Sequence, residues 1–393
     1  MATFRQHGPT ELPGTTVDVA VIGGGIAGAA VAAELALDHR VALLEAEQHP
    51  GYHSTGRSVA MLDLAYGNAV VQALTVASVE PLRKLQEWAG GAPFLLPRGV
   101  MYVARSDQES AFAQFHERVR MPGHRVEYHH GSFAHSKVPL FRDGYVAFCA
   151  WEPDAMEFDV AALLSALLRQ FRARGGRVML SARVEALEYG HGQWQLRCPD
   201  MAISAACVIN AAGAWADQIA SLAGGEPLGL VPMRRTVCTV PVAEAPAQAS
   251  WPFVVDIDED FYFKQEAGRL LVSPADETPV APGDAWPDDL DVALAVERLE
   301  AACNLVVGRV GHCWAGLRSF FSDRSPAIGP DAALPQFFWC AGLGGYGIQT
   351  ALGAAAHLGA VLRRMAPSLE LARAGEPAGL DPARFISHIP NIN

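Results

Sequence analysis

The sequence predicts an α/β fold in which a mainly parallel sheet, built from segments far apart in the chain, is covered by an antiparallel α+β cap. Three units, starting near residues 17, 205 and 337, each read as a buried strand, a turn of small residues and a helix. The segments between them hold more Trp, Tyr and Pro and alternate like antiparallel strands, as in FYFKQEAGRLLVSP. A chain of 393 residues also exceeds one simple core.

The composition limits the classes of partner. Half of the residues are hydrophobic and 18% are charged, the balance of a water-soluble globular protein. The formal net charge of -12 argues against a nucleic-acid partner, which would require clustered Lys and Arg. The longest apolar run, residues 19–33, is too short to cross a bilayer, and the N-terminus lacks a signal-peptide core. We therefore expect no integral membrane segment and a cytoplasmic location.

The cysteines predict neither disulfides nor a metal centre. The chain has 7 of them, an odd number, and none forms a CxxC pair. This spacing is typical of reduced, mostly buried thiols in a cytoplasmic protein.

The first unit carries the strongest short motif. Val17–Ile22 reads as a buried parallel strand, and Gly23, Gly25 and Gly28 then form GxGxxG at the start of an alanine-rich helix that runs to about Leu37. The first glycine makes the tight turn, the second lets the main chain approach a pyrophosphate, and the third lets the helix pack closely on the strand.

An acidic residue follows at the distance that dinucleotide binding requires. Glu45 ends the next strand, Val41–Leu44, about 20 residues after the glycines, where it can accept hydrogen bonds from a ribose diol. The helix N-terminus would hold the pyrophosphate through its free N–H groups and its dipole. The unit therefore predicts dinucleotide binding, and by itself it fits either NAD or FAD.

The other two units repeat this logic. Apolar residues from 160 to 171 recur at helical spacing, and this predicted helix has Asp159 as its N-cap and ends at Gly175-Gly176. The segments 177–190 and 192–198 then read as strands joined by a Gly-His-Gly turn. A strand then leads to the small turn Ala211-Ala212-Gly213 and a helix. In the last unit the strand Phe337–Cys340 precedes GLGGYG and a helix after Ile348. We expect a cofactor-binding domain made of 1–95, 146–230 and 311–393, and a substrate-binding cap made of 96–145 and 231–310.

Longer motifs resemble one known family. In chain order they are VIGGGIAGA, LLEAEQHPGYHSTGRS, AYG, VINAAGAWAD, PMRRT, FYFKQEAG, WAGLRSF and GGYGIQT. Together they resemble the D-amino-acid-oxidase-like (DAO) FAD-dependent oxidoreductases over nearly the whole chain, and most of all the bacterial D-arginine dehydrogenases and other D-amino-acid dehydrogenases among them. The resemblance implies a Rossmann-like FAD-binding domain beneath a cap, with FAD as the cofactor.

The resemblance also implies which residues surround the cofactor. Glu45 would bind the adenosine ribose, the main chain near Val184 would face adenine, and the STGRS and GGYGI loops would flank the flavin ring. Small hydroxyl residues and glycines suit the polar edge of a flavin. Arg57 either pairs with a phosphate, supports the loop or is an ordinary surface residue. The full set of predicted cofactor-binding residues is Gly23, Gly25, Ile26, Ala27, Gly28, Glu45, Ala46, Ser54, Thr55, Arg57, Ser58, Val59, Ala60, Val184, Ala212, Gly213, Trp215, Gly344, Gly345, Gly347 and Ile348.

An amino-acid substrate needs a cation for its carboxylate, and arginine offers a bidentate fork. By resemblance Arg235, Tyr262 and Arg318 would clamp the carboxylate, with a hydroxyl from Tyr66. A structural salt bridge is the alternative for Arg318, and the spacing does not decide between Arg234 and Arg235. The predicted substrate-site residues are Met61, Asp63, Tyr66, Val100, Arg235, Tyr262, Arg318, Gly345 and Tyr346.

Three of these positions depart from the D-arginine dehydrogenases. Val100 stands where they have an acidic residue, Met61 replaces a histidine, and Asp63 replaces a threonine. The first two changes predict a neutral or apolar substrate side chain, whereas Asp63 offers a possible cation site. No cysteine stands beside Arg318, which predicts non-covalent FAD, and Leu270 replaces the oxygen-activating lysine of sarcosine oxidase, which hints at a dehydrogenase.

The resemblance thus implies oxidation of a D-amino acid by hydride transfer from Cα to flavin N5. The amine must be neutral when the hydride leaves, and no side chain is assigned as the base. The imine would hydrolyse to a 2-oxo acid and ammonia, and a quinone, an electron-transfer protein or O2 would accept the electrons. The alternatives are oxidation of a secondary amine, an N-methyl amino acid or a 2-hydroxy acid, and a flavin-carrying electron-transfer subunit without its own substrate.

Overall fold

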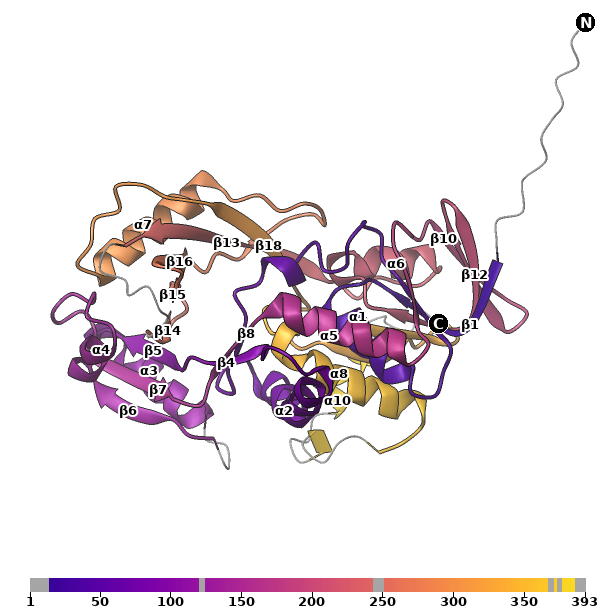
Figure 1. The fold of residues 1–393 in the computed structure, drawn as a ribbon, viewed down its shortest axis with the longest axis horizontal. Coiled ribbons are helices and arrows are strands. Elements are labelled where there is room, and N and C mark those ends of the chain that lie inside the picture. The colour runs from indigo at the N-terminus through magenta and orange to yellow at the C-terminus, as the bar shows by residue number, and fades with distance from the viewer. Residues whose placement is uncertain (1–13, 120–123, 243–250, 367–370, 373–376, 386–393) are drawn as a thin grey trace, which may run out of the picture.

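The structure is a computed structural model that describes residues 14–119, 124–242, 251–366, 371–372 and 377–385. Figure 1 shows two parts side by side, an α/β part on the right and a second sheet-rich part on the left. The predicted fold class, a mainly parallel α/β sheet with a largely antiparallel cap, is confirmed.

The first sheet holds eight strands in the described part of the chain. Their order is β10 (Ala186–Gly190), β11 (Gln193–Cys198), β12 (Met201–Asn210), β1 (Gly14–Ile22), β2 (Val41–Leu44) and β9 (Arg177–Met179), with β20 (Phe337–Ala341) beside β12 and β19 (Ala327–Pro330) beside β20. Strand β12 pairs in parallel with both β1 and β20. The first strands of the three predicted units are therefore neighbours, and their turns meet at one edge of the sheet.

Helices cover this sheet and the cap. Those described are α1 (Ile26–Leu35), α2 (Ala69–Ala89), α3 (Glu109–Arg118), α4 (Gly131–Lys137), α5 (Val160–Ala173), α6 (Ala216–Leu222), α7 (Asp289–Ala302), α8 (Gly347–Leu362) and α10 (Pro377–Leu380), with 3-10 turns η1 (Thr55–Arg57), η2 (Ser106–Gln108), η3 (Gly213–Trp215) and η4 (Pro382–Phe385). Helix α1 packs against α5 and α8, which explains why its alanines and valines are buried on nearly every side.

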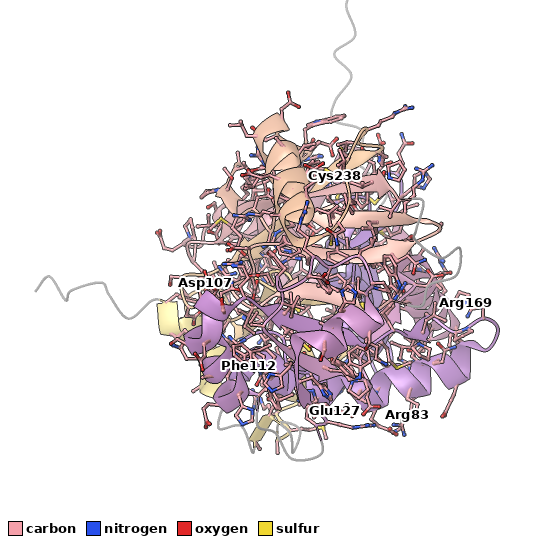
Figure 2. All side chains as sticks on the ribbon, turned by 90° about the vertical axis from the view of Figure 1, so that its left-hand side faces the viewer. Arg83, Asp107, Phe112, Glu127, Arg169 and Cys238 are labelled. Carbon is pink, nitrogen blue, oxygen red and sulfur yellow. The ribbon has the colours of Figure 1, made fainter. Side chains whose placement is uncertain are left out.

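The second sheet forms the cap. It contains β17 (Thr278–Pro279), β13 (Val231–Pro241), β16 (Arg269–Ser273), β15 (Tyr262–Glu266), β14 (Phe253–Asp256), β5 (Val100–Ala104), β7 (Phe148–Glu152) and β6 (Glu127–His130) in that order, with β18 (Cys313–Phe320) beside β13. Its pairs are antiparallel except β14 with β5. Figure 2, which looks onto this part, labels Asp107, Phe112 and Glu127 on the earlier cap segment and Cys238 on the later one.

A small third sheet lies between the two parts in Figure 1. Its strands are β3 (Met61–Leu62), β8 (Met156–Phe158) and β4 (Leu95–Pro97), in that order. Because β3 follows the η1 loop, while β4 precedes β5 and β8 follows β7 of the second sheet, this small sheet connects that loop to the cap. The domain boundaries drawn from the sequence stay a prediction, and β7 and β18, expected with the cofactor domain, pair in the second sheet.

Most predicted elements are present, with two instructive differences. Asp159 caps α5 by accepting the N–H of Ala162, as expected. The strand expected over 177–190 is split, because 177–179 joins the parallel sheet beside β2 while 186–190 starts an antiparallel hairpin. Helix α2, with Pro81 inside it, was not expected, although Asn68 is a clear N-cap signal.

Candidate active site

The glycine turn after β1 has the close approaches that its sequence requires. Gly23 has φ +106°, and a Cβ there would lie 2.4 Å from the carbonyl oxygen of Ala211 in the neighbouring unit. A Cβ on Gly28 would lie 1.8 Å from the carbonyl oxygen of Gly23, which is the helix–strand contact predicted from the motif. Gly25, the N-cap of α1, has no side chain, and the Thr55 hydroxyl accepts the N–H of Ile26, so the remaining N–H groups of the first turn are left for a ligand.

A cavity of about 620 Å³ opens at this turn. All three strand–turn–helix units contribute to its wall. The predicted cofactor residues that line it are Gly23, Gly25, Ile26, Ala27, Glu45, Ala46, Ser54, Thr55, Val184, Ala212, Gly213, Trp215, Gly344 and Gly347. The cavity combines a helix N-terminus, an acidic strand end and glycine-lined main chain, which fits an extended dinucleotide.

The Glu45 carboxylate is fixed at the cavity wall. Its Oε2 accepts the N–H of Gly24 at 2.8 Å and its Oε1 accepts the N–H of Glu47 at 2.8 Å. Each oxygen retains a lone pair, so the carboxylate can also accept hydrogen bonds from a ribose diol.

The STGRS loop is held mainly by the protein itself. The Thr55 hydroxyl accepts the N–H of Ile26 at 3.0 Å, and the Ser54 hydroxyl donates to the carbonyl of Leu317 at 2.6 Å. Arg57 does not line the cavity; its guanidinium donates to the carbonyls of Ala285 and Ala315, both at 3.0 Å, and pairs with Asp284. Of the roles considered for Arg57, this geometry matches support of the loop.

A second, smaller cavity of about 70 Å³ lies between the loop and the cap. Residues from the cofactor loop, from α8 and from the second sheet meet there. Its lining is Ser58, Val59, Ala60, Met61, Asp63, Tyr66, Tyr102, Arg235, Phe253, Val255, Glu259, Tyr262, Arg318, Gly345, Ile348 and Gln349. We call this cavity the substrate pocket. Val100 and Tyr346 do not line it: Val100 is fully buried in the same apolar cluster as Tyr102, and the Tyr346 ring packs edge-on against Tyr66.

Arg318 stands in the pocket without an anion. Its Nη1 donates to the Tyr66 hydroxyl at 3.0 Å, and among the described residues no carboxylate lies within salt-bridge distance, so the alternative of a structural salt bridge is not seen. Burial works against its charge, but Tyr66, Tyr262 and Glu259 nearby raise its pKa, so it stays cationic. A Cβ on Gly345 would lie 2.7 Å from the guanidinium, so only glycine leaves room for it.

The two adjacent arginines of PMRRT point to different surroundings. Arg235 lines the pocket, donates from Nε to the carbonyl of Asp276 at 2.8 Å and pairs with Glu277. Arg234 does not line it and pairs with Asp291 at 2.8 Å. The alternation of side chains along β13 separates them.

Sequence reasoning missed several pocket residues. Tyr102 lies two positions after Val100 on the same strand face, Glu259 is an exposed carboxylate with φ +58°, and Gln349 follows the GGYGI loop. The period of two along β5 was the one signal for Tyr102.

Burial raises the pKa of Asp63, the acid that stands where the D-arginine dehydrogenases have a threonine. The lack of water, and then the adjacent Glu152 carboxylate, raise the pKa of Asp63 well above its usual value. Its Oδ1 accepts the N–H of Ala65 and its Oδ2 accepts the Tyr102 hydroxyl at 2.5 Å. Asp63 is therefore a buried, hydrogen-bonded wall of the pocket whose surroundings favour its protonated form.

The described residues hold no disulfide, no metal-ligand cluster and no helix that could span a membrane. All 7 cysteines are free and 6 of them are buried, as predicted. No cluster of potential metal ligands occurs among the residues that the structure covers. Within the same ranges, none of the helices combines the length and apolarity needed to traverse a bilayer.

The chain resembles known flavoproteins in sequence. The family model described as FAD dependent oxidoreductase (DAO) matches residues 18–361. The chain is 23% identical over 395 residues to mitochondrial dimethylglycine dehydrogenase of Rattus norvegicus, covering 94% of this chain and 45% of that protein. It is 24% identical over 405 residues to FAD-dependent oxidoreductase domain-containing protein 1 of Mus musculus, covering 88% and 80%. This chain thus spans less than half of the dimethylglycine dehydrogenases that it matches.

Solved structures share the fold. L-proline dehydrogenase from P. horikoshii superposes with a TM-score of 0.82 at 21% identity, covering 95% of this chain and 99% of that one. Glycine oxidase from Geobacillus kaustophilus gives 0.78 at 21% identity, covering 91% and 98%. Together with the glycine turn, the Glu45 carboxylate and the matched residues, these findings identify the cofactor as FAD. The chain belongs to the DAO family of FAD-dependent oxidoreductases.

Proposed function

We propose that this protein oxidises an amino acid at its C–N bond, and that a D-amino acid with a neutral or apolar side chain is the preferred substrate. The observation that carries this proposal is the half-buried Arg318 guanidinium, which faces the pocket beside Tyr66 with no carboxylate partner among the described residues. A cation removed from water and left unpaired favours binding of an anion, and a substrate carboxylate supplies one.

The pocket residues orient the substrate. Arg318 and the Tyr66 hydroxyl bind the carboxylate, and Arg235 with Tyr262 closes the other side. The carbonyl of Gly345 accepts a hydrogen bond from the amino group. Bound FAD would supply the hydride acceptor, and these residues would hold the substrate so that its Cα–H faces the cofactor cavity.

The wall that meets the substrate side chain is mostly apolar. Met61, Phe253, Val255 and Ile348 line the pocket, and Asp63 is held protonated by its surroundings. A guanidinium or ammonium side chain would find no fixed carboxylate at that wall, since Glu259 is the exposed acid of the lining. This supports a neutral substrate over D-arginine.

The second candidate is a secondary amine or N-methyl amino acid. The printed names of similar proteins favour it: dimethylglycine dehydrogenase, sarcosine dehydrogenase, L-proline dehydrogenase and iminodiacetate oxidase. A 2-hydroxy acid would use the same carboxylate site. An electron-transfer subunit without a substrate is disfavoured because the pocket keeps its charged lining.

An anaerobic bleaching panel tests the proposal. Purified holoprotein is mixed with D- and L-amino acids, N-methyl amino acids and 2-hydroxy acids, and loss of flavin absorbance is followed. We expect D-Met, D-Leu and D-Phe to bleach the flavin with higher kcat/KM than D-Arg and D-Lys. Faster bleaching by N-methyl amino acids would favour the second candidate, and bleaching by none would leave the electron-transfer subunit.

We also propose that FAD is held without a covalent bond and that a quinone, an electron-transfer protein or O2 reoxidises it. The residues that follow Arg318 are Ser319 and Phe320, neither of which offers a thiol. Acid denaturation should therefore release the yellow colour into the supernatant. Flavin that remains with the precipitated protein would overturn the non-covalent assignment.

A further inference from the structure

Two buried carboxyl groups meet beside the substrate pocket. Asp63 follows β3, and Glu152 ends β7 of the cap. The main chain fixes both: Asp63 Oδ1 accepts the N–H of Ala65 at 2.9 Å, and Glu152 Oε1 accepts the N–H of Leu64 at 3.1 Å. The exposed fractions of the two residues are only 4% and 2%. They are therefore held together by adjacent residues of one loop.

The contact between the two carboxyls requires a proton. The contact with Glu152 raises the pKa of Asp63, and the contact with Asp63 lowers that of Glu152, which places a proton on Asp63, since an ionised carboxylate can only accept. Glu152 Oε2 is buried and no donor from the described protein reaches it. A proton shared by the pair satisfies both groups. Burial raises the pKa of each carboxyl, which agrees with one proton being held at neutral pH.

The pair is connected at both ends. On the pocket side, Asp63 Oδ2 accepts the hydroxyl of Tyr102 at 2.5 Å, and both residues line the pocket. On the other side, Nε2 of His124 lies 3.0 Å from Oε1 of Glu152, close enough to bond once the ring is reoriented, although it makes no hydrogen bond in this arrangement. Two further acids influence the cluster electrostatically, Asp154 near Glu152 and His124, and Glu259 near Tyr102.

Apart from Gln349, whose side chain accepts the N–H of Asp63, the side chains packed around Tyr102 are mostly apolar. The ring of Tyr102 packs on Phe115 with centroids 4.4 Å apart, and Val100 and Val119 belong to the same apolar cluster. In such an environment charge is costly, so a proton that enters the pair is redistributed along its hydrogen bonds rather than lost to bulk water.

We propose that Tyr102, Asp63 and Glu152 form a proton relay that takes the excess proton from the ammonium group of a bound amine and passes it toward His124. The inference rests on the proposed amine oxidation and deepens it. Before hydride transfer the amine must be neutral, and Tyr102 and Asp63 are pocket-lining groups connected to an acceptor with capacity for a second proton.

The transfer balances. The ammonium N–H bond breaks and its proton goes to the Tyr102 oxygen, while the Tyr102 proton moves to Asp63 and the shared proton shifts to Glu152. The amine keeps its lone pair and becomes neutral. The pair changes from one negative charge and one proton to two protons and no charge. Release of one proton by way of His124 restores the starting state.

The test compares anaerobic flavin reduction across pH in the native holoprotein and in Tyr102→Phe and Glu152→Gln, with saturating amino acid. We expect the limiting rate near neutral pH to fall about 100-fold, the lower end of general acid–base contributions. The loss should shrink as rising pH makes the free amine neutral. Tyr145→Phe is the matched control, because Tyr145 bonds to Arg105 in the same cap and does not line the pocket.

An infrared readout tests the shared proton independently of turnover. The native holoprotein should show a carboxylic-acid carbonyl band near neutral pH that is absent in Asp63→Asn. Absence of that band, or variants with the native pH profile, would overturn the relay while the amine oxidation stands. If no amine bleaches the native flavin, the proposed function itself fails, which the same experiment reveals first.

Discussion

The cofactor cavity and the substrate pocket share the loop from residue 54 to 63 but differ in how they are built. The first is lined largely by glycine, alanine and main chain from neighbouring parallel strands. The second combines polar and charged side chains with an apolar wall, and its residues come from the loop, from α8 and from the cap. The cofactor cavity is thus formed by close approach of the main chain, whereas the proposed binding of a substrate would depend on charged side chains contributed by both parts of the molecule.

The largest effect is expected where the main chain has no space. In Gly23→Ala, the new Cβ would meet Ala211 at 2.4 Å in a backbone with φ +106°. The strain alone costs about 1–3 kcal/mol, and relief of the clash would open the turn, so the protein should purify without flavin. The ratio of flavin to protein absorbance measures this.

The matched control for that change is Gly192→Ala. Gly192 also has positive φ, +80°, but an added Cβ there meets nothing within 4 Å, and the residue lies outside the cofactor cavity. It should lose some stability and keep its flavin. If both variants bound FAD equally, close approach would not be what forms the cofactor site.

The next effect is expected in the pocket. Arg318→Met removes the cation assigned to the substrate carboxylate, and loss of one partner of a buried charge pair costs about 4 kcal/mol. We expect kcat/KM for the best amino acid to fall about 1,000-fold with flavin content unchanged. Arg318→Lys should recover part of the loss, and the exposed Arg142→Met on the cap should behave as native. A native kcat/KM in Arg318→Met would refute the clamp.

A smaller effect is expected at the join between the two regions. Arg57→Met removes two hydrogen bonds to carbonyls and an ion pair with Asp284, which together should cost about 2 kcal/mol of unfolding free energy. FAD affinity should change little, since Arg57 does not line the cavity. Thermal unfolding and flavin titration measure the two quantities.

Arg40→Met is the control for Arg57. Arg40 pairs with Asp18 at the surface, where an ion pair contributes about 1 kcal/mol or less. A large loss of FAD affinity in Arg57→Met, without a loss of apoprotein stability, would instead assign Arg57 to a cofactor phosphate.

The smallest effect concerns the pH dependence of stability. Burial first, and Glu152 second, raise the pKa of Asp63 above 3.8. Between that value and the raised one the folded protein binds a proton that the unfolded chain does not, so native stability falls as pH rises. Asp63→Asn cannot lose this proton, so its Tm should exceed that of the native protein at pH ~8 and approach it at pH ~4.

Asp18→Asn should show the opposite sign. Hydrogen bonds from Arg40 lower the pKa of Asp18, so this carboxylate contributes stability above its unfolded pKa and loses it in acid. A variant at Asp63 with the same pH trend as this control would contradict a neutral Asp63.

The two cavities also differ in how far the sequence predicted them. The three strand–turn–helix units, the helix N-cap Asp159 and the contact of Gly28 with Gly23 were predicted because each depends on residues within about 20 positions of one another. The motifs also gave the family and the positions of Arg318, Tyr66 and Arg235. The cytoplasmic location, the electron acceptor and the preference for a D-amino acid remain predictions.

The sequence by itself determined the cofactor site, because GxGxxG and its acidic strand end form a local arrangement that any parallel sheet completes. Only the tertiary structure decided which side chains meet beside the substrate pocket and which of their protonated forms are favoured. Tyr102 and Asp63 are 39 residues apart, and Glu152 bonds to Leu64 across 88 residues. Their shared proton exists because the pairing of β5 with β7 buries these acids together, and no period along the chain encodes that pairing.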